Sequence, residues 1–200
     1  SLYAPLANHD LETAKSIMRI FKKAYIYIGT LILFLGLCIS PFVQHLIKVP
    51  PNIAYLNIFF LLFVIDTGIS YFYSYKKCLL IADQKQYIAN YYRGITQLIG
   101  SLFQIALVIL THSFWVYIIL RICMTFCENF LIARKANRLY SFLNEKNIQP
   151  LNKDIYQSII RNIKALILHK IGGVTVFGTS NIILSKFVGL SAVALYTNYY

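Results

Sequence analysis

Long apolar runs, separated by shorter polar or basic stretches, dominate the hydropathy pattern of this chain. Five runs have the length of about 17 to 25 residues that a helix needs to cross a bilayer. They predict helical spans at about 24–47, 53–75, 94–110, 114–133 and 171–195. The last run holds a single charge, Lys186, near its middle. The pattern therefore predicts an all-α fold, a polytopic transmembrane helix bundle.

Two polar segments have the 3.6-residue period of an amphipathic helix. The opening SLYAPLANHD is predicted to be a turn, in which Asp10 can cap a helix that continues over 11–23. The apolar face of that helix is expected to carry Leu11, Ala14, Met18, Phe21 and Tyr25, with Lys15, Arg19, Lys22 and Lys23 off the face. The second amphipathic helix lies in 134–170, after a break at Pro150, with Asp154 as its expected cap. Its apolar face is expected to carry Ile155, Ile159, Ile163 and Leu166.

The composition indicates the class of protein, and the distribution of charge predicts its orientation in the membrane. The chain is 58% hydrophobic and 13% charged, which is outside the range of soluble domains and typical of integral membrane proteins. The number of lysines and arginines alternates from one connecting segment to the next. The segments 1–23, 76–93 and 134–170 are rich in basic residues, whereas the turn 48–52 has one and the turn 111–113 has none. The positive-inside rule then makes the three basic segments cytoplasmic. The net charge of +12 is thereby explained without a nucleic-acid partner.

Four of the five spans carry polar side chains at helical spacing, so that each has one face suited to water or to polar partners. The polar sets are Asp66, Ser70 and Tyr73; Gln97, Ser101 and Gln104; Tyr117, Arg121, Thr125 and Glu128; and Thr175, Thr179 and Lys186. Four such helices can surround a hydrophilic cavity, as a transporter requires. The alternative is that these residues only join helices by hydrogen bonds.

The four charges inside the spans are the strongest functional candidates, because a charge at the bilayer centre costs at least about 2.5 kcal/mol. Arg121 can grip a phosphate with its planar fork and Lys186 can act as a point charge. Asp66 and Glu128 are then counterions or protonatable coupling sites. Since the four charges balance, purely structural ion pairs remain the alternative.

Signatures of catalysis, cofactor binding and metal binding are absent from the sequence. The chain has no phosphate-cradling glycine loop and no nucleotide fingerprint, and Cys123 and Cys127 are expected to be packing residues. Gly172, Gly173, Gly178 and Gly189 are expected to allow close approach of helices. We therefore expect neither an enzyme nor a cofactor or metal.

Three stretches together resemble the Wzx-type polysaccharide flippases of the multidrug/oligosaccharidyl-lipid/polysaccharide exporter superfamily. They are SLYAPLANHD at 1–10, YSYKKCLLIADQKQYI at 73–88 and LILHKIGGVTVFGTSNIILSKFVGLSAVALYTNYY at 166–200. The similarity covers essentially the whole chain, and the last stretch is the most specific. One departure is Ser180, where members of the family often carry an aspartate.

The resemblance implies a piece of a longer, two-lobe transporter in a bacterial plasma membrane. Residues 1–133 would complete the first lobe, 134–170 would be the cytoplasmic linker between the lobes, and 171–200 would open the second lobe. The implied activity is flipping of undecaprenyl-pyrophosphate-linked oligosaccharide to the outer leaflet by alternating access, in contact with membrane lipid and with polysaccharide polymerase machinery. The alternatives are a cation-coupled multidrug exporter of the same superfamily, a membrane-embedded glycan polymerase and a non-transporting membrane scaffold.

Overall fold

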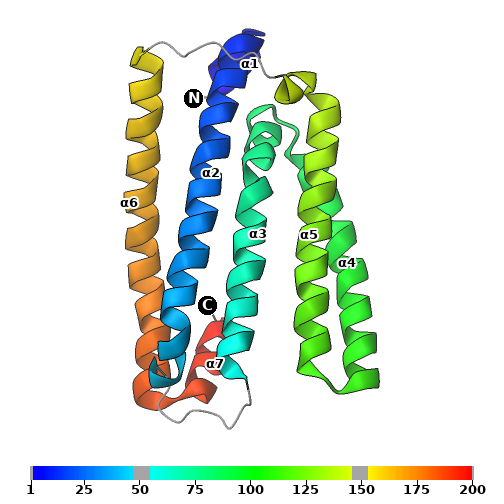
Figure 1. Ribbon diagram of the computed structural model, residues 1–200, viewed down its shortest axis with the longest axis vertical. Helices are drawn as coiled ribbons and strands as arrows, with labels where there is room; N and C mark the ends of the chain where they lie inside the picture. Colours follow the sequence, from blue (N-terminus) through cyan, green and yellow to red (C-terminus); the bar gives the residue numbers. More distant parts are fainter. Residues whose placement is uncertain (1, 47–54, 146–152, 200) are drawn as a thin grey trace. The chain divides into compact units, whose positions relative to one another are not determined.

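The protein is all-α, as the hydropathy pattern predicts. The computed structural model describes residues 2–46, 55–145 and 153–199, and all regular structure in these ranges is helical (Figure 1). The helices are α1 (Tyr3–Ala7), α2 (Leu11–Ile39), α3 (Leu56–Ala82), α4 (Gln86–Thr111), α5 (Phe114–Leu139), α6 (Lys153–Ile183) and α7 (Leu190–Tyr199). Two short 3₁₀ helices, η1 (Ser40–Leu46) and η2 (Ser141–Asn144), and a π-helical turn, η3 (Leu184–Val188), complete the set.

Four helical stretches in the described ranges are long and apolar enough to cross a membrane. They are Leu11–His45, Leu56–Ala82, Gln86–Thr111 and Phe114–Leu139. Their positions match the first four predicted spans, but the helices run further into the basic flanks, because no residue there stops a helix. The fold is that of a multi-pass membrane protein.

The start and end of α2 follow local chemistry. The Asp10 carboxylate accepts a hydrogen bond of 3.0 Å from the Thr13 backbone N–H, which is the expected N-terminal cap. The preceding segment is not simply a turn as predicted, since it contains the short helix α1. At the other end α2 changes into η1 at Ser40, where Pro41 cannot donate the next α-helical hydrogen bond.

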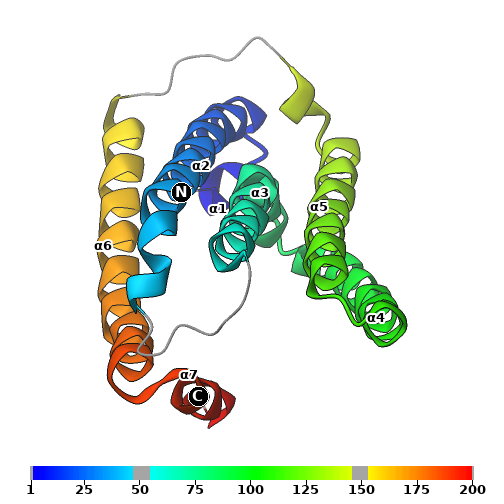
Figure 2. The ribbon, with the colours of Figure 1, turned by 60° about the horizontal axis from the view of Figure 1, so that its bottom comes forward.

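The chain divides into two compact units, which are described separately. The first comprises Ser1–Gly36 and Leu61–Leu151, and the second comprises Leu37–Phe60 and Asn152–Tyr200. In the first unit α4 and α5 are side by side, joined by a turn at 112–113 in which His112 adopts a left-handed conformation (Figure 2). The tight turn predicted at 111–113 is therefore confirmed. That it faces outward stays a prediction. The turn predicted at 48–52 and Pro150 lie outside the described residues.

Glycines bring α2 and α3 into close contact in the first unit. A Cβ atom built on Gly29 would lie 2.8 Å from the Phe72 ring. A Cβ built on Gly68 of α3 would lie 2.7 Å from Leu33 of α2. Small residues at such positions let transmembrane helices pack backbone to backbone. The sequence analysis assigned this role to glycines near the end of the chain, but a Cβ on Gly172 would meet nothing within 4 Å.

The apolar core of the first unit lies where α2 and α4 begin and where α3 and α5 end. Its buried side chains include Ala14, Ile17, Met18, Leu79, Leu80, Ile88, Ala89, Ile132, Ala133, Ala136 and Phe142. These positions border the segments that the charge pattern predicts to be cytoplasmic. The unit is therefore packed most tightly at its predicted cytoplasmic end.

Polar groups fasten η2 to this core. The Tyr140 hydroxyl donates a 2.6 Å hydrogen bond to Asp83, and the Lys85 ammonium lies 2.7 Å from the same carboxylate. Burial alone would raise the pKa of the Asp83 carboxyl, but the hydrogen bonds from Lys85 and Tyr140 outweigh it and lower that pKa. Burial, followed by the hydrogen bond to Asp83, raises the pKa of Tyr140 well above its usual value.

Lys15 corrects one prediction about α2. The sequence places Lys15 off the apolar face, yet its side chain is only 5% exposed. Its ammonium contacts the carboxylates of Glu12 and Glu145, each at 2.8 Å. The helical period cannot show this, because Glu145 is brought to Lys15 by tertiary packing. The pair fastens the residue after η2 to the start of α2.

The second unit corrects the predicted span 171–195. Helix α6 runs without a break from Lys153 to Ile183, so the second amphipathic helix and the first half of this span are one helix. The α-helix then widens into η3, and Gly189, with φ of 129°, separates η3 from α7. Such a φ suits glycine alone, which is why the span divides at this residue. In the first turns of α6, Ile159 is buried as predicted, whereas Ile155 is exposed.

Candidate functional site: a polar groove on α4 and α5

Two of the predicted polar faces meet in one groove of the first unit. The groove has a volume of about 280 Å³. Its lining residues are Arg93, Thr96, Gln97, Gly100, Ser101 and Gln104 of α4 with Tyr117, Arg121, Met124, Thr125 and Glu128 of α5. Because the two helices are joined by a very short turn, they pack as antiparallel neighbours and their polar faces come to the same level. The structure thus places Gln97, Ser101 and Gln104 opposite Arg121 and Glu128.

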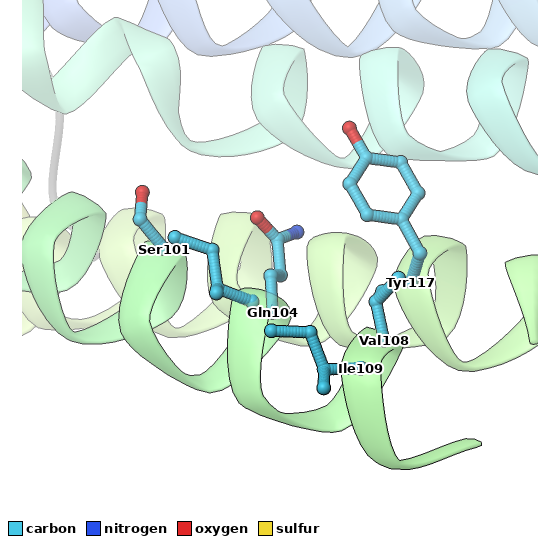
Figure 3. A pocket seen from close by; sticks show the side chains of 6 residues that line it. Ser101, Gln104, Val108, Ile109 and Tyr117 are labelled. Atoms are coloured by element: carbon cyan, nitrogen blue, oxygen red, sulfur yellow. The ribbon is translucent and has the colours of Figure 1, made fainter. Parts of the chain in front are cut away.

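A second, more apolar hollow of about 460 Å³ adjoins the groove (Figure 3). The two share Ser101, Gln104 and Tyr117. In Figure 3 the polar ends of these three side chains point to the same side, while Ile109 points the other way. The hollow therefore joins a row of hydrogen-bonding groups to an apolar floor. A ligand with a polar head and an apolar tail has matching surfaces along this line.

Arg121 is the positive charge of the groove, and Asp66 of α3 holds it in place. The guanidinium Nε donates to the Asp66 carboxylate at 3.1 Å, and the guanidinium also lies 5.3 Å from the centre of the Phe63 ring. The two partners differ in exposure, since the side chain of Arg121 is 46% exposed and that of Asp66 only 9%. The pair is therefore asymmetric, because the Asp66 carboxylate is enclosed whereas nearly half of the Arg121 side chain is accessible.

The Asp66 carboxylate is not fully satisfied by Arg121. Its Oδ1 atom is buried and has no hydrogen-bond partner in the described ranges. A buried carboxylate oxygen without a hydrogen-bond partner costs free energy, and a bound cation would offset that cost. This arrangement is compatible with both roles predicted for Asp66, counterion and coupling site.

Glu128 lies in the same groove but is not the counterion of Arg121. It lines the groove together with Arg93 at the end where α4 begins. The ion pairs of the described residues do not include one of Glu128. The sequence predicts two acids as possible counterions of Arg121, and in the structure Asp66 is the one that pairs with it.

The remaining polar residues of α3 are satisfied within the helix or by aromatic contacts. The Ser70 hydroxyl donates to the Thr67 carbonyl oxygen at 2.7 Å. The ring of Tyr73 packs edge to face against Phe126 of α5, with centroids 6.2 Å apart. The predicted polar face of α3 therefore contributes no lining residue to the groove, and Asp66 is linked to it only through Arg121.

Lys186 belongs to the second unit. It lies in η3, and its ammonium donates a 2.7 Å hydrogen bond to the backbone carbonyl oxygen of His45, in η1. Thr179 is an exposed residue of α6, and the side chain of Thr175 lies outside the described residues. Short π-helical turns such as η3 are frequent at functional sites in membrane and soluble proteins alike.

Arg93, Thr96, Gly100 and Met124 are lining residues that sequence reasoning missed. Arg93 was assigned to a cytoplasmic segment, because hydropathy places the start of the span at Gly94. Its spacing of four residues from Gln97 was the available signal, since such a spacing keeps both residues on one helix face. Gly100 leaves room for Met124, which would lie 3.0 Å from a Cβ at that position.

Comparisons with protein-family models, with curated proteins and with solved structures find no match for this chain. Function is therefore inferred from the residues of the groove, from the membrane-spanning character of the helices and from the resemblance described above.

Proposed function

We propose that this chain is part of a membrane transporter that flips undecaprenyl-pyrophosphate-linked oligosaccharide to the outer leaflet by alternating access. The supporting observation is the half-exposed Arg121 in a polar groove carried by helices able to span a membrane. A cation at that depth is costly unless it is compensated, and Asp66 compensates it only in part. Two oxygens of a phosphate group can accept paired N–H hydrogen bonds from one guanidinium, so a pyrophosphate suits Arg121.

The other polar residues have roles that fit this substrate. Arg121 binds the pyrophosphate within the groove, and Asp66 and Glu128 serve as counterions or coupling groups. Lys186, a cation of η3 in the second unit, is a separate candidate for binding phosphate. The amide and hydroxyl side chains of α4 line the path of the sugar in the groove: Gln97, Ser101 and Gln104. The polyprenyl tail stays in lipid, beside the apolar hollow. The transporter resides in a bacterial plasma membrane, with residues 1–23, 76–93 and 134–170 on the cytoplasmic side.

The test is complementation of a flippase-null strain by the intact protein. Arg121→Gln and Lys186→Gln are each expected to abolish surface glycan. The amount of protein in the membrane is measured alongside, because Arg121→Gln leaves the enclosed Asp66 carboxylate without its partner. Arg134→Gln, which removes a charge from the same helix α5 outside the groove, is the matched control and is expected to complement. Full complementation by both the Arg121 and the Lys186 variant would overturn the assignment of the pyrophosphate site.

The second candidate is a cation-coupled multidrug exporter of the same superfamily. The buried, unpartnered Oδ1 atom of Asp66 favours it, because such an atom is suited to bind a coupling ion. Export of a cationic dye that depends on a sodium or proton gradient, with no change in surface glycan, would select this candidate. Absence of gradient-dependent dye export, together with loss of surface glycan in cells that lack the protein, would select the flippase.

A further inference from the structure

A group of lysines gathers where the start of α2 lies against the end of α3. The two helices are antiparallel and their register is fixed by Gly36 against Val64 and by Gly29 against Phe72. Seven residues before Gly29 is Lys22, and the same register places it level with Leu79, within about one helical turn of Lys76 and Lys77.

A hydrogen-bonding contact at this level confirms the register. The Tyr25 hydroxyl lies 3.0 Å from the sulfur of Cys78. Lys22 is one helical turn before Tyr25, and Lys77 is the neighbour of Cys78. The ammonium groups of Lys22 and Lys76 are close enough to repel each other. We call Lys22, Lys23, Lys76 and Lys77 the lysine patch.

Six of the seven acidic residues have described side chains, and none of these six neutralises this patch. Glu12 and Glu145 bind Lys15, Asp66 binds Arg121, and Asp83 binds Lys85. Asp10 caps α2, and Glu128 lines the groove. In the described ranges none of the four lysines of the patch has an ion pair. Within about one helical turn, four cations therefore remain without an anion from the described side chains.

The patch also has the surroundings of a membrane interface. Lys22 and Lys23 are exposed, while Lys76 and Lys77 are partly covered. The Tyr25 and Tyr71 rings lie just toward the apolar part of α2 and α3, with centroids 6.4 Å apart. Tyrosines occupy the headgroup level of membrane proteins, and lysines extend their ammonium groups to the same level. The charge pattern places this end of the helices on the cytoplasmic side, where anionic lipids attract basic residues.

We infer that the lysine patch is a binding site for the phosphate headgroup of an anionic phospholipid at the α2–α3 pair. The lipid supplies the negative charge that the protein lacks at this level, and its acyl chains continue along the exposed apolar residues of α2. This site is distinct from the groove on α4 and α5 and does not depend on the proposed transport activity.

The experiment is native mass spectrometry of the intact protein in detergent, titrated with phosphatidylglycerol. The Lys22→Gln/Lys76→Gln variant is compared with Arg134→Gln/Lys135→Gln, which removes two charges from the same predicted side on α5. Each lysine near a lipid surface contributes about 1 kcal/mol, so the patch variant is expected to bind about 30-fold more weakly and the control to bind as the wild type does. Lys22→Arg/Lys76→Arg keeps the charge and is expected to retain binding.

Two results would overturn the inference. Equal weakening by the patch and control variants would mean that the lysines act only through the total charge. Displacement of the lipid by millimolar inorganic diphosphate would mean a site for soluble phosphates rather than for a lipid. Phosphatidylcholine is expected not to bind in either case. Since the readout is lipid binding, failure here leaves the complementation test of the groove unaffected.

Discussion

Gly36 offers a direct test of the packing between α2 and α3. Replacement by alanine would put a Cβ atom in contact with both methyl groups of Val64, at 2.7 Å from Cγ2 and closer still to Cγ1. The Cβ of Val64 itself would be only 3.0 Å away. Valine in a helix has one strongly preferred rotamer, so these methyl groups cannot turn aside. The helices would have to separate.

The expected magnitude follows from two opposing terms. Overpacking of this kind costs about 1 to 3 kcal/mol, and the rigid Val64 argues for the upper end. Alanine gains up to about 1 kcal/mol over glycine inside a helix. Gly36→Ala should therefore destabilise the protein by about 2 kcal/mol. For a chain of this size that corresponds to a fall in Tm of about 4 to 8 °C.

Gly94→Ala is the matched control, because a Cβ at Gly94 of α4 would meet nothing within 4 Å. It is expected to leave Tm unchanged or to raise it slightly. Heating the detergent-solubilised protein and following the remaining folded fraction by size-exclusion chromatography measures both variants. The double variant Gly36→Ala/Val64→Ala removes the two methyl groups and should recover most of the loss. Equal Tm values for Gly36→Ala and Gly94→Ala would contradict the close packing of Gly36 against Val64.

Two further predictions concern the end of the unit where η2 is fastened. Tyr140→Phe removes a hydrogen bond to a partly exposed carboxylate and should cost about 1 kcal/mol near neutral pH. Because the pKa of Asp83 is lowered in the fold, the contribution is present above about pH 4 and is lost as the pH falls through the lowered value. Wild type and variant should therefore converge in Tm in acid, and a constant difference would contradict the assignment. Glu145→Gln should speed hydrogen exchange in 141–145, whereas Glu12→Gln, which pairs with Lys15 within α2, should not; equal exchange in both would show that the contact does not hold η2.

Hydropathy and helical period predicted the membrane helices well, because both are properties of consecutive residues. They misjudged helix ends for the same reason. Nothing between Leu11 and Ile39 stops a helix, so the amphipathic segment and the span are one helix even though their composition changes. In the span predicted at 171–195 the composition is uniform, but Gly189 adopts a φ of 129° that no hydropathy profile can register.

The groove could be predicted in part. The short connection of three residues predicts antiparallel packing of the two apolar helices, which brings their polar faces to the same level. The identity of the acid beside Arg121 was not predictable, because it depends on how α3 packs against α5 rather than on spacing within either helix. The burial of Lys15 was hidden for the same reason, as Glu145 is 130 residues away in the chain.

The asymmetry of the Asp66–Arg121 pair provides a sharper test between a transporter and a scaffold. Removing Arg121 alone leaves an enclosed carboxylate without its partner, which in buried pairs costs about 3 to 5 kcal/mol, so loss of function in that variant has two readings. Asp66→Asn/Arg121→Gln removes both charges and avoids this cost. If the pair only joins α3 to α5, the double variant should fold and support surface glycan as the wild type does. If the accessible guanidinium binds the pyrophosphate, the double variant should have a normal Tm and membrane level but no flipping. A folded and fully active double variant would therefore eliminate the groove as the substrate site.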